Sequence, residues 1–438
     1  MNANDKTQMT QNSNAQNIGS DQQFSSIFLG LGEHGPLWCA PEICALALGP
    51  PRAGKTTTVI IPNIILAKNS VISVSTKSDV IDATNRIRAD HGPCFLFDPT
   101  NALVSARDVQ RVGWSPLHSA NDWERAVLTA DAMVGATGNR SDRDGSHWRE
   151  RASALLATLF HAAALDESPM ARVVQAVNRR DAEHFVEVLA RKDANLALDL
   201  LTGIRETDPR EQSGIWSTAS GVLSAFRMGA TLASTLLPGI DWKSFVERPS
   251  TLYVASPSDH QRHIAPLIAG LIRDLRSYSA ERFSTIDPSK AFRVLLILDE
   301  LANIAPLHDL PVLIAEGASQ GIVTLASLQD LSQARSRWGI AGEGFLSLFG
   351  AKIIFGGIGD RATLSDISAL AGEHYVRSIS VTKRRHLGSW VGAGTQIGMT
   401  REPRLSLDAI AGPPPGEATV IIGAEPHHCR LVPYFARP

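Results

Sequence analysis

The sequence is poor in cysteine and in aromatic residues, and neither sign of charge dominates it. Four cysteines among 438 residues, with no Cys-x-x-Cys pair, exclude a disulfide-rich secreted scaffold and indicate free thiols in a reducing cytosol. Lys and Arg number 42 and Asp and Glu 44, so a globally basic nucleic-acid binder is excluded, whereas a local basic groove is not. Because only 6% of residues are aromatic, we expect any contact with single-stranded DNA to depend mainly on phosphates and to weaken with salt.

Long apolar runs are absent as well. No stretch reaches the roughly 18 residues that a membrane helix needs, because the longest candidate, residues 59–67, is interrupted by Pro62 and Asn63. The first residues are mostly Asn, Gln, Ser and Asp, which predicts a disordered polar tail over residues 1–23 and neither a signal peptide nor an anchor. We therefore expect a cytoplasmic protein.

What the sequence does contain is a series of short, β-rich apolar runs that alternate with amphipathic helical stretches. Hydrophobic residues make up 44% of the chain, enough to bury a core. The runs predict strands at Ile43–Leu48, Ser70–Thr76, Cys94–Asp98, Thr251–Ala255, Arg293–Leu298, Ile322–Ser327 and Lys352–Gly356. Most are continuously apolar, as strands are when helices cover both faces of a sheet. The pattern predicts an α/β fold with a mostly parallel sheet.

The middle of the chain has a different pattern. From about residue 121 to residue 237 no strand-like run occurs, and helical segments such as Trp148–Leu165 carry apolar residues at the spacing of one helix face. Strands resume afterwards. We therefore interpret residues 121–237 as an all-α domain inserted into an α/β domain made of residues 24–120 and 238–438.

The C-terminal part gives weaker signals. Residues 372–403 are rich in Ser, Thr, Gly and Arg with weak periodicity, and they include the basic cluster Lys383, Arg384, Arg385 and His386. We interpret this cluster as part of a solvated loop rather than as a dedicated nucleic-acid contact, which stays open as the alternative. The run Pro413–Gly416 then predicts a turn before two short strands, Glu417–Gly423 and His428–Phe435.

The strongest motif is a glycine-rich loop directly after the first predicted strand. It matches G-x-x-x-x-G-K-[ST] without a mismatch and reads Gly49-Pro50-Pro51-Arg52-Ala53-Gly54-Lys55-Thr56. A helix is predicted over Thr56–Leu66, so backbone N–H groups and the helix N-terminus would bind phosphate. We expect Lys55 to reach the β- and γ-phosphates of ATP as a catalytic residue, and Thr56 to offer its hydroxyl to Mg²⁺. Thr57 completes the predicted nucleotide-binding residues.

Two further sites lie at the ends of predicted strands. Asp299 and Glu300 follow Arg293–Leu298, at the sheet edge where ligands bind in open α/β folds. We expect Asp299 to hold Mg²⁺ and Glu300 to polarise the water that attacks the γ-phosphate. Gln329, one strand further on, would suit a γ-phosphate sensor that acts in catalysis. The alternative, an ordinary turn residue, stays open.

These motifs and their context predict a RecA-like P-loop ATPase with a helical insertion. At this point the sequence resembles the TraG/TraD-type coupling proteins of type IV secretion and conjugation systems. The resemblance covers roughly residues 28–435 and is carried by the order and spacing of Gly49–Thr56, Val71–Lys77, Phe97-Asp98-Pro99, Trp148, Asp299–Ala302, Gln329–Gln333, Phe349–Ile353, Pro415–Ala418 and Pro433-Tyr434-Phe435.

The resemblance implies a homo-hexameric ring that hydrolyses ATP between its subunits. Such a ring would receive a relaxase-linked single DNA strand, or a secreted protein, and pass it to the secretion channel. It also implies that the helical block faces the cytoplasm and recognises the substrate.

Two departures from the family pattern bear on this reading. Family members usually carry N-terminal membrane helices, and this sequence has none, so a membrane-anchored component of the channel would recruit the chain to the inner face of the cell membrane. Some relatives also place a trans-acting arginine where residues 316–321 have none; Arg52, Arg335 or Arg337 could substitute. An ATPase that exports effector proteins and a nucleotide-binding adaptor without motor activity remain as alternatives.

Overall fold

The computed structural model describes residues 26–436, with gaps at residues 77, 104–107, 138–142, 256, 288–292, 305–306, 308 and 387–388. The polar tail expected over residues 1–23 lies outside the described residues. Among the helices within these ranges, none is both long enough and apolar enough to cross a membrane.

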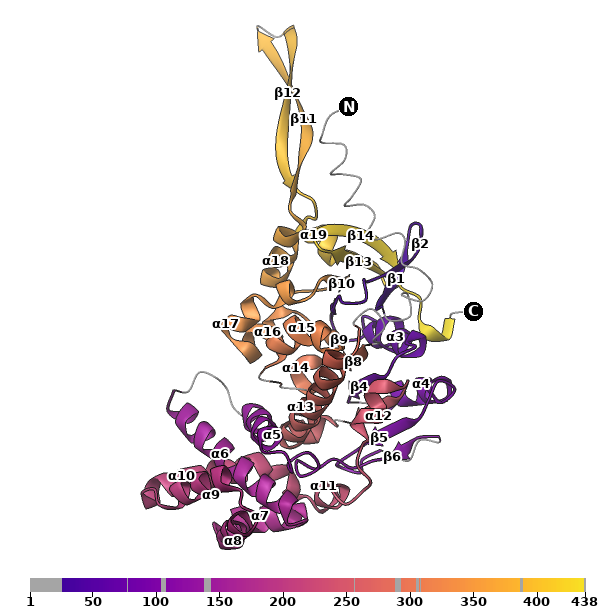
Figure 1. The fold of residues 1–438 in the computed structure, drawn as a ribbon. Coiled ribbons are helices and arrows are strands. Elements are labelled where there is room, and N and C mark those ends of the chain that lie inside the picture. Colours follow the sequence, from indigo (N-terminus) through magenta and orange to yellow (C-terminus); the bar gives the residue numbers. More distant parts are fainter. Residues whose placement is uncertain are drawn as a thin grey trace.

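A twelve-stranded mixed sheet forms the centre of the molecule, in the order β2-β1-β14-β13-β10-β3-β9-β8-β4-β7-β5-β6 (Figure 1). The eight strands from β10 to β6 are parallel, and their bounds are Ala351–Phe355 (β10), Ala45–Leu48 (β3), Ile322–Leu328 (β9), Val294–Leu298 (β8), Val71–Ser75 (β4), Thr251–Ala255 (β7), Cys94–Phe97 (β5) and Gln110–Arg111 (β6). Four antiparallel strands extend the sheet beyond β10, namely Glu417–Ile422 (β13), Glu425–Arg430 (β14), Phe28–Gly32 (β1) and Gly35–Trp38 (β2).

The sheet confirms the α/β fold class and the seven strands predicted before residue 360. Each predicted run contains its strand or differs from it by at most two residues at an end. Strand β14 begins earlier than expected, at Glu425 in place of His428. The reason is a turn of only two residues after Ile422, which connects β13 to β14 as an antiparallel hairpin. Strands β1, β2 and β6 were not predicted. Strands β1 and β2 read FLGLG and GPLW, with the glycine and proline residues that are typical of turns, and β6 has only two residues.

Helices cover the sheet and also form a separate group at one end of the molecule (Figure 1). The group at the end is formed by Arg143–Leu165 (α6), Met170–Arg179 (α7), Glu183–Arg191 (α8), Asn195–Arg205 (α9) and Pro209–Val222 (α10). The others are Ile61–Leu66 (α3), Asp79–Ala89 (α4), Trp123–Gly135 (α5), Gly229–Ser234 (α11), Trp242–Glu247 (α12), Gln261–Thr285 (α13), Leu301–Ile304 (α14), Leu310–Glu316 (α15), Leu331–Trp338 (α16), Ile340–Glu343 (α17), Arg361–Ala371 (α18) and Leu407–Ala411 (α19).

Aspartates fix where several helices begin. The side chains of Asp122, Asp208, Asp330 and Asp360 each accept a hydrogen bond from a backbone N–H in the first turn of α5, α10, α16 and α18, respectively. This N-cap satisfies a donor that has no partner inside the helix. Asp208 is followed by Pro209, whose fixed φ suits the first helical position.

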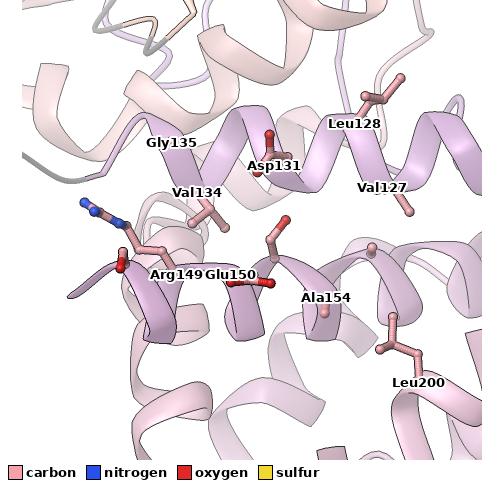
Figure 2. Close-up of a pocket in the computed structure, with 12 residues that line it drawn as sticks. Val127, Leu128, Asp131, Val134, Gly135, Arg149, Glu150, Ala154 and Leu200 are labelled. Atoms are coloured by element: carbon pink, nitrogen blue, oxygen red, sulfur yellow. The ribbon is translucent and has the colours of Figure 1, made fainter. Parts of the chain in front are cut away.

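A pocket of about 440 Å³ lies between α5 and α6 (Figure 2). It is lined by apolar and charged side chains together: Val127, Leu128, Asp131, Val134 and Gly135 of α5, Ser146, Arg149, Glu150, Ser153, Ala154 and Ala157 of α6, and Leu200 of α9. The pocket therefore belongs to the helical part of the chain and not to the edge of the sheet.

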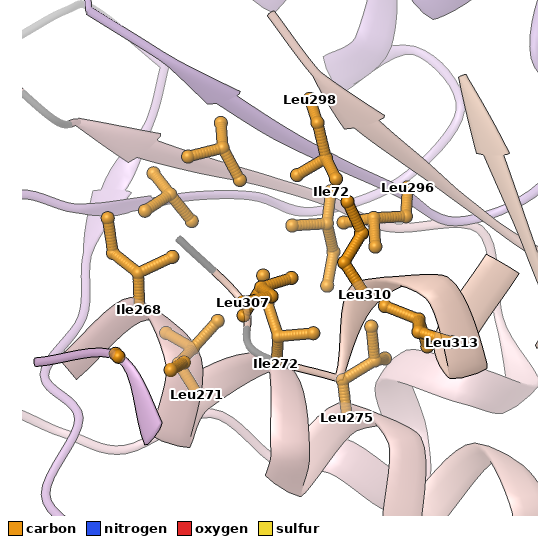
Figure 3. Close-up of a cluster of buried hydrophobic side chains, with 14 of the residues drawn as sticks. Ile72, Ile268, Leu271, Ile272, Leu275, Leu296, Leu298, Leu307, Leu310 and Leu313 are labelled. Carbon is orange, nitrogen blue, oxygen red and sulfur yellow. The ribbon is translucent and has the colours of Figure 1, made fainter. Parts of the chain in front are cut away.

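Helix α13 packs its apolar side against one face of the sheet (Figure 3). Ile268, Leu271, Ile272 and Leu275 of this helix are buried there, with Ile72, Leu296 and Leu298 of β4 and β8 and with Leu310 and Leu313 of α15. The same continuous core includes residues of the helical group, such as Leu155 and Phe160 of α6. The two parts of the chain thus share one core.

The structure corrects the interpretation of the basic cluster at residues 383–386 as part of a loop. The surrounding segment forms a two-stranded antiparallel hairpin, with β11 at Glu373–His386 and β12 at Ser389–Pro403, which projects from the body (Figure 1). The backbone of the basic cluster at 383–386 therefore lies in a strand. The described side chains of the two strands, at residues 373–379 and 397–403, are exposed or half-buried, so no strict alternation of apolar and polar residues is needed there.

A buried carboxyl links α13 to the segment that precedes α5. Asp274 accepts hydrogen bonds from Trp114 Nε1 at 2.7 Å and from Ser119 Oγ at 2.6 Å. Gly270 makes room for the indole, since a Cβ there would lie 2.3 Å from Trp114 Cη2. Burial raises the pKa of Asp274 from 3.8 to about 6, although both hydrogen bonds act in the opposite direction.

This raised pKa makes stability depend on pH. Because the folded state binds the Asp274 proton more tightly than the unfolded state, the stabilisation is complete below about pH 4 and is lost as the pH rises through about 6. Asp274→Asn stays neutral and retains both partners if its amide donates to Ser119. We expect its Tm to be at least equal to that of the wild type at pH 8 and to vary less between pH 5 and pH 8. Thermal unfolding followed by tryptophan fluorescence measures this, with Asp199→Asn, an exposed position, as control. An unchanged pH dependence in Asp274→Asn would contradict the assignment.

Candidate nucleotide-binding site

The glycine-rich loop connects the buried strand β3 to a helix that begins at its last residue. Thr56–Ile60 form a π-helical turn that continues into α3, in agreement with the helix predicted over Thr56–Leu66. Gly49 is required because a Cβ there would lie 2.6 Å from the Cβ of Phe355. Gly54 has φ +95°, a conformation that other residues rarely adopt. The loop therefore exposes its backbone at the N-terminus of a helix, where N–H groups favour anions.

Lys55 is buried inside this loop. Its Nζ donates hydrogen bonds to the carbonyl oxygen of Gly49 and, at 3.0 Å, to that of Pro50. Burial lowers the pKa of Lys55, while the charges of Asp299 and Glu300 oppose the shift. The acceptors of the ammonium group are thus neutral carbonyl oxygens, which the charged oxygens of a phosphate can replace.

A chain of hydrogen bonds joins the loop to the two strands beside it. Thr56 Oγ1 donates to Asp299 Oδ2 at 2.9 Å, and Ser327 Oγ donates to Asp299 Oδ1 at 2.9 Å. The N–H of Glu300 in turn donates to Ser327 Oγ at 3.0 Å. Burial raises the pKa of Asp299, against the effect of the hydrogen bonds from Ser327 and Thr56. The structure thus brings the predicted pair Thr56 and Asp299 into direct contact, and the hydroxyl and carboxylate oxygens are donors of the kind that Mg²⁺ prefers.

Glu300 adopts a left-handed backbone conformation, with φ +56°. This conformation is rare for residues other than glycine, asparagine and aspartate, and it is held only where the surroundings fix it. Here the hydrogen bond from its N–H to Ser327 contributes to fixing it. The predicted carboxylate pair therefore lies at the C-terminal end of β8.

Gln329 directly follows β9, which lies between the strand of the loop, β3, and the strand of the carboxylates, β8. The N–H of Gly49 donates to the carbonyl oxygen of Leu328 at 3.2 Å, so the start of the loop touches the residue before Gln329. The N–H of Gln329 donates to Gln333 Oε1 of α16 at 2.9 Å. The position is compatible with the predicted sensor, whose role stays a prediction.

The other predicted loop residues surround Lys55 in different ways. Pro51 and Arg52 are exposed at the crest of the loop, where Arg52 has φ +67°. Pro50 and Ala53 are half-buried below them. The hydroxyl of Thr57 donates to the carbonyl oxygen of Gly54 at 3.2 Å and so stabilises the loop from within.

Ser327 is a site residue that sequence reasoning missed. It was assigned only to the end of a strand, yet its hydroxyl orients Asp299 and fixes Glu300. A signal was present: it is a hydroxyl residue in a strand that is otherwise mostly apolar and entirely buried, two residues before Gln329.

The arginines considered as substitutes for a trans-acting one differ in their surroundings. Arg335 lies 3.2 Å from Asp360 and also pairs with Asp366, so its charge is already engaged. Burial lowers the pKa of Arg337, which is half-buried on the same helix. Arg276 of α13 also reaches the segment at 316–321 and donates to Gln320 Oε1 at 2.7 Å, but it pairs with Glu316 at 2.8 Å and with Asp309 at 3.4 Å, so its charge is engaged as well.

Taken together, a glycine-rich loop, a buried lysine and a threonine–carboxylate pair at the C-terminal edge of a parallel sheet define an α/β P-loop nucleotide-binding protein. The chain belongs to the family described as type IV secretory system conjugative DNA transfer, whose model matches residues 5–402.

Solved structures with this fold include members of conjugation systems. The bacterial conjugative coupling protein TrwBdeltaN70 in its unbound form is 18% identical with a TM-score of 0.69, and the match covers 99% of this chain and 92% of that one. TrwB in complex with ADP and Mg²⁺ is also 18% identical, with a TM-score of 0.64 over 90% and 86% of the chains. VirB4 of Thermoanaerobacter pseudethanolicus is 12% identical, with a TM-score of 0.51 over 95% and 97%. A search of curated proteins finds no match.

Proposed function

We propose that this chain is an ATP-hydrolysing coupling protein, which recruits a relaxase–DNA or protein substrate and drives its transfer through a type IV secretion or conjugation channel. The observation that carries the proposal is the contact between Thr56 and Asp299 beside the buried Lys55 in a chain of this family. TrwB, which shares the fold, has been solved with ADP and Mg²⁺ and with the non-hydrolysable ATP analogue ADPNP.

Each site residue has one role in this proposal. Lys55 leaves the carbonyl oxygens of the loop and binds the β- and γ-phosphates, and the N–H groups of the loop bind the remaining phosphate oxygens. Thr56 and Asp299 would hold Mg²⁺, which would neutralise charge on the phosphates. Glu300 orients and polarises the attacking water, and Gln329 senses the γ-phosphate.

Gln329 has a direct route to the next helix. Since its N–H bonds to Gln333, a displacement of Gln329 moves α16 at its first turn. Helix α16 also carries Arg335, which pairs with Asp360 at the start of α18. We infer that loss of the γ-phosphate shifts α16 and α18 together, and that this shift is the motion coupled to hydrolysis.

We assign the nucleotide chemistry to residues 24–120 and 238–438 and substrate recognition to the helical residues 121–237. The pocket between α5 and α6 supports this assignment, since it combines apolar side chains with Asp131, Arg149 and Glu150 of these two helices (Figure 2). The chain would act as a homo-hexamer at the inner face of the cell membrane, recruited by a membrane-anchored component of the channel. Among the arginines, Arg52 is exposed beside the nucleotide site and is available to a neighbouring subunit.

Steady-state ATP hydrolysis with and without single-stranded DNA tests the function. We expect DNA to stimulate hydrolysis, and we expect the apparent DNA affinity to fall on the order of tenfold or more between low and moderate salt, since phosphate contacts release counterions. Glu300→Gln provides the blank. Activity that is indifferent to DNA would favour the export of effector proteins, and activity no higher than the blank would favour a nucleotide-binding adaptor.

A further inference from the structure

The hairpin of β11 and β12 has two chemically different faces. Residues paired across an antiparallel ladder lie on the same face, and successive residues alternate between faces. The register therefore places on one face, which we call the apolar–basic face, Tyr375, Arg377, Ile379, Ile397, Met399 and Arg401. The opposite face receives His374, Val376, Ser378, Gly398, Thr400 and Glu402.

The large apolar side chains of the apolar–basic face are exposed to solvent. Tyr375 is 67% exposed, Ile379 61%, Ile397 56% and Met399 66%. A two-stranded hairpin is only marginally stable in water unless a third element covers its apolar face. Exposed apolar side chains gathered on one surface mark an interaction site. We conclude that this face is covered when the protein functions.

The charge of the hairpin limits what can cover it. Residues 373–403 contain five basic and two acidic residues, a net charge of +3, whereas the whole chain has −2. The basic residues are Arg377, Lys383, Arg384, Arg385 and Arg401, and the acidic ones Glu373 and Glu402. The partner of the hairpin must therefore be negatively charged as well as able to receive aliphatic side chains.

The position of the hairpin leaves it accessible to a large flat surface. It stands clear of the body, at the end of the molecule opposite to helices α6–α10 (Figure 1). Its base is fixed to the sheet, because Arg404 N–H donates to the carbonyl oxygen of Gly372 at 2.9 Å and the Arg404 side chain pairs with Glu425 of β14 at 3.0 Å. The hairpin can thus meet a surface without rearrangement of the nucleotide site.

We propose that the apolar–basic face binds the surface of an anionic lipid membrane. Aliphatic residues and a tyrosine enter the boundary between headgroups and acyl chains, and Arg377 and Arg401 of this face bind lipid phosphates. The charges of Lys383, Arg384 and Arg385 add to the attraction of the hairpin for anionic lipid. Nucleic acid also offers phosphates, but it would bury the isoleucines and Met399 only if its bases were unstacked, which costs a few kcal/mol per step. A second copy packed face to face would bring arginines of like charge together. The inference adds a direct lipid contact by this chain to the proposed function. Vesicle binding is measured without nucleotide, so the lipid contact and the ATP-driven function can each fail without the other.

Co-sedimentation of the full chain with vesicles tests the proposal. The probes are vesicles of phosphatidylglycerol and phosphatidylethanolamine in equal parts, compared with vesicles of phosphatidylcholine alone. We expect binding to the anionic vesicles only. Ile379→Ser combined with Ile397→Ser should weaken it about tenfold or more, and replacement of Lys383, Arg384 and Arg385 by glutamine about a hundredfold. Val376→Ser, an aliphatic residue of the opposite face, is the matched control and should bind like the wild type.

Thermal unfolding of each variant verifies that the body of the protein remains folded, which is expected because the hairpin lies outside the core. Wild-type protein that ignores anionic vesicles, or vesicle binding that survives the double isoleucine substitution, would overturn the proposal. So would a double variant that loses self-association in analytical ultracentrifugation while it keeps its lipid binding, since the face would then join copies of this chain.

Discussion

Lys55→Ala is expected to reduce ATP binding at least about a hundredfold, because it removes the only positive charge that the loop Gly49–Thr56 directs inward. The ammonium group donates hydrogen bonds to the carbonyl oxygens of Gly49 and Pro50. Burial lowers its pKa, and the charges of Asp299 and Glu300 act in the opposite direction. Equilibrium titration with a fluorescent ATP analogue measures the loss.

Lys68→Ala is the matched control for this variant. Lys68 follows the far end of the same helix, α3, and is exposed. It should bind ATP like the wild type. If Lys55→Ala bound the analogue as tightly as Lys68→Ala, the loop would not be the nucleotide site, and the proposed function would lose its basis.

Glu300→Gln is expected to preserve ATP binding and to slow hydrolysis by about 10² to 10⁴-fold, the range of general acid–base contributions. Glutamine has nearly the shape of glutamate and keeps the backbone hydrogen bond from residue 300 to Ser327, so the left-handed conformation can persist. It cannot accept a proton from the attacking water. Single-turnover hydrolysis of radiolabelled ATP, together with analogue binding, separates the two effects.

Glu343→Gln, an exposed position on α17, controls for loss of a carboxylate elsewhere. Wild-type hydrolysis in Glu300→Gln would show that another group polarises the water. Loss of binding together with hydrolysis would instead indicate that the Glu300 carboxylate supports the local fold, since the substitution leaves the backbone hydrogen bond to Ser327 in place.

The elements that could be predicted are those whose place in the fold requires a recognisable local sequence pattern. Buried parallel strands need continuous apolar runs, so β4, β7 and β8 were recognisable. The loop at Gly49–Thr56 was recognisable because its conformation needs glycine at fixed positions. The assignment of residues 121–237 to substrate recognition, by contrast, remains a proposal.

Features that depend on packing between distant segments were not predictable. Ser327 acquires its role only when β9 lies between β3 and β8, an order that the sequence does not reveal. Arg276 reaches the segment at 316–321 from a helix about 40 residues earlier, so a search for arginine within the segment could not find it. The two strands around the basic cluster at 383–386 were not predictable, because a hairpin that stands clear of the body needs no strict alternation of apolar and polar residues.

Helix α13 has a mechanical consequence. Its 25 residues span about 37 Å, and they pack against β4 and β8 on one side while Asp274 holds Trp114 and Ser119 next to α5. A close-packed interior transmits displacement without slack. Asp299 directly follows β8, so a shift of that strand would displace α13. Helix α13 would then displace α5, which lines the pocket between α5 and α6. Pro266 interrupts the hydrogen bonds of α13 near its start, but every residue of the helix named here in contact with the sheet or with Trp114 and Ser119 follows that proline. The later part of α13 therefore connects the nucleotide site directly to the pocket to which we assign substrate recognition.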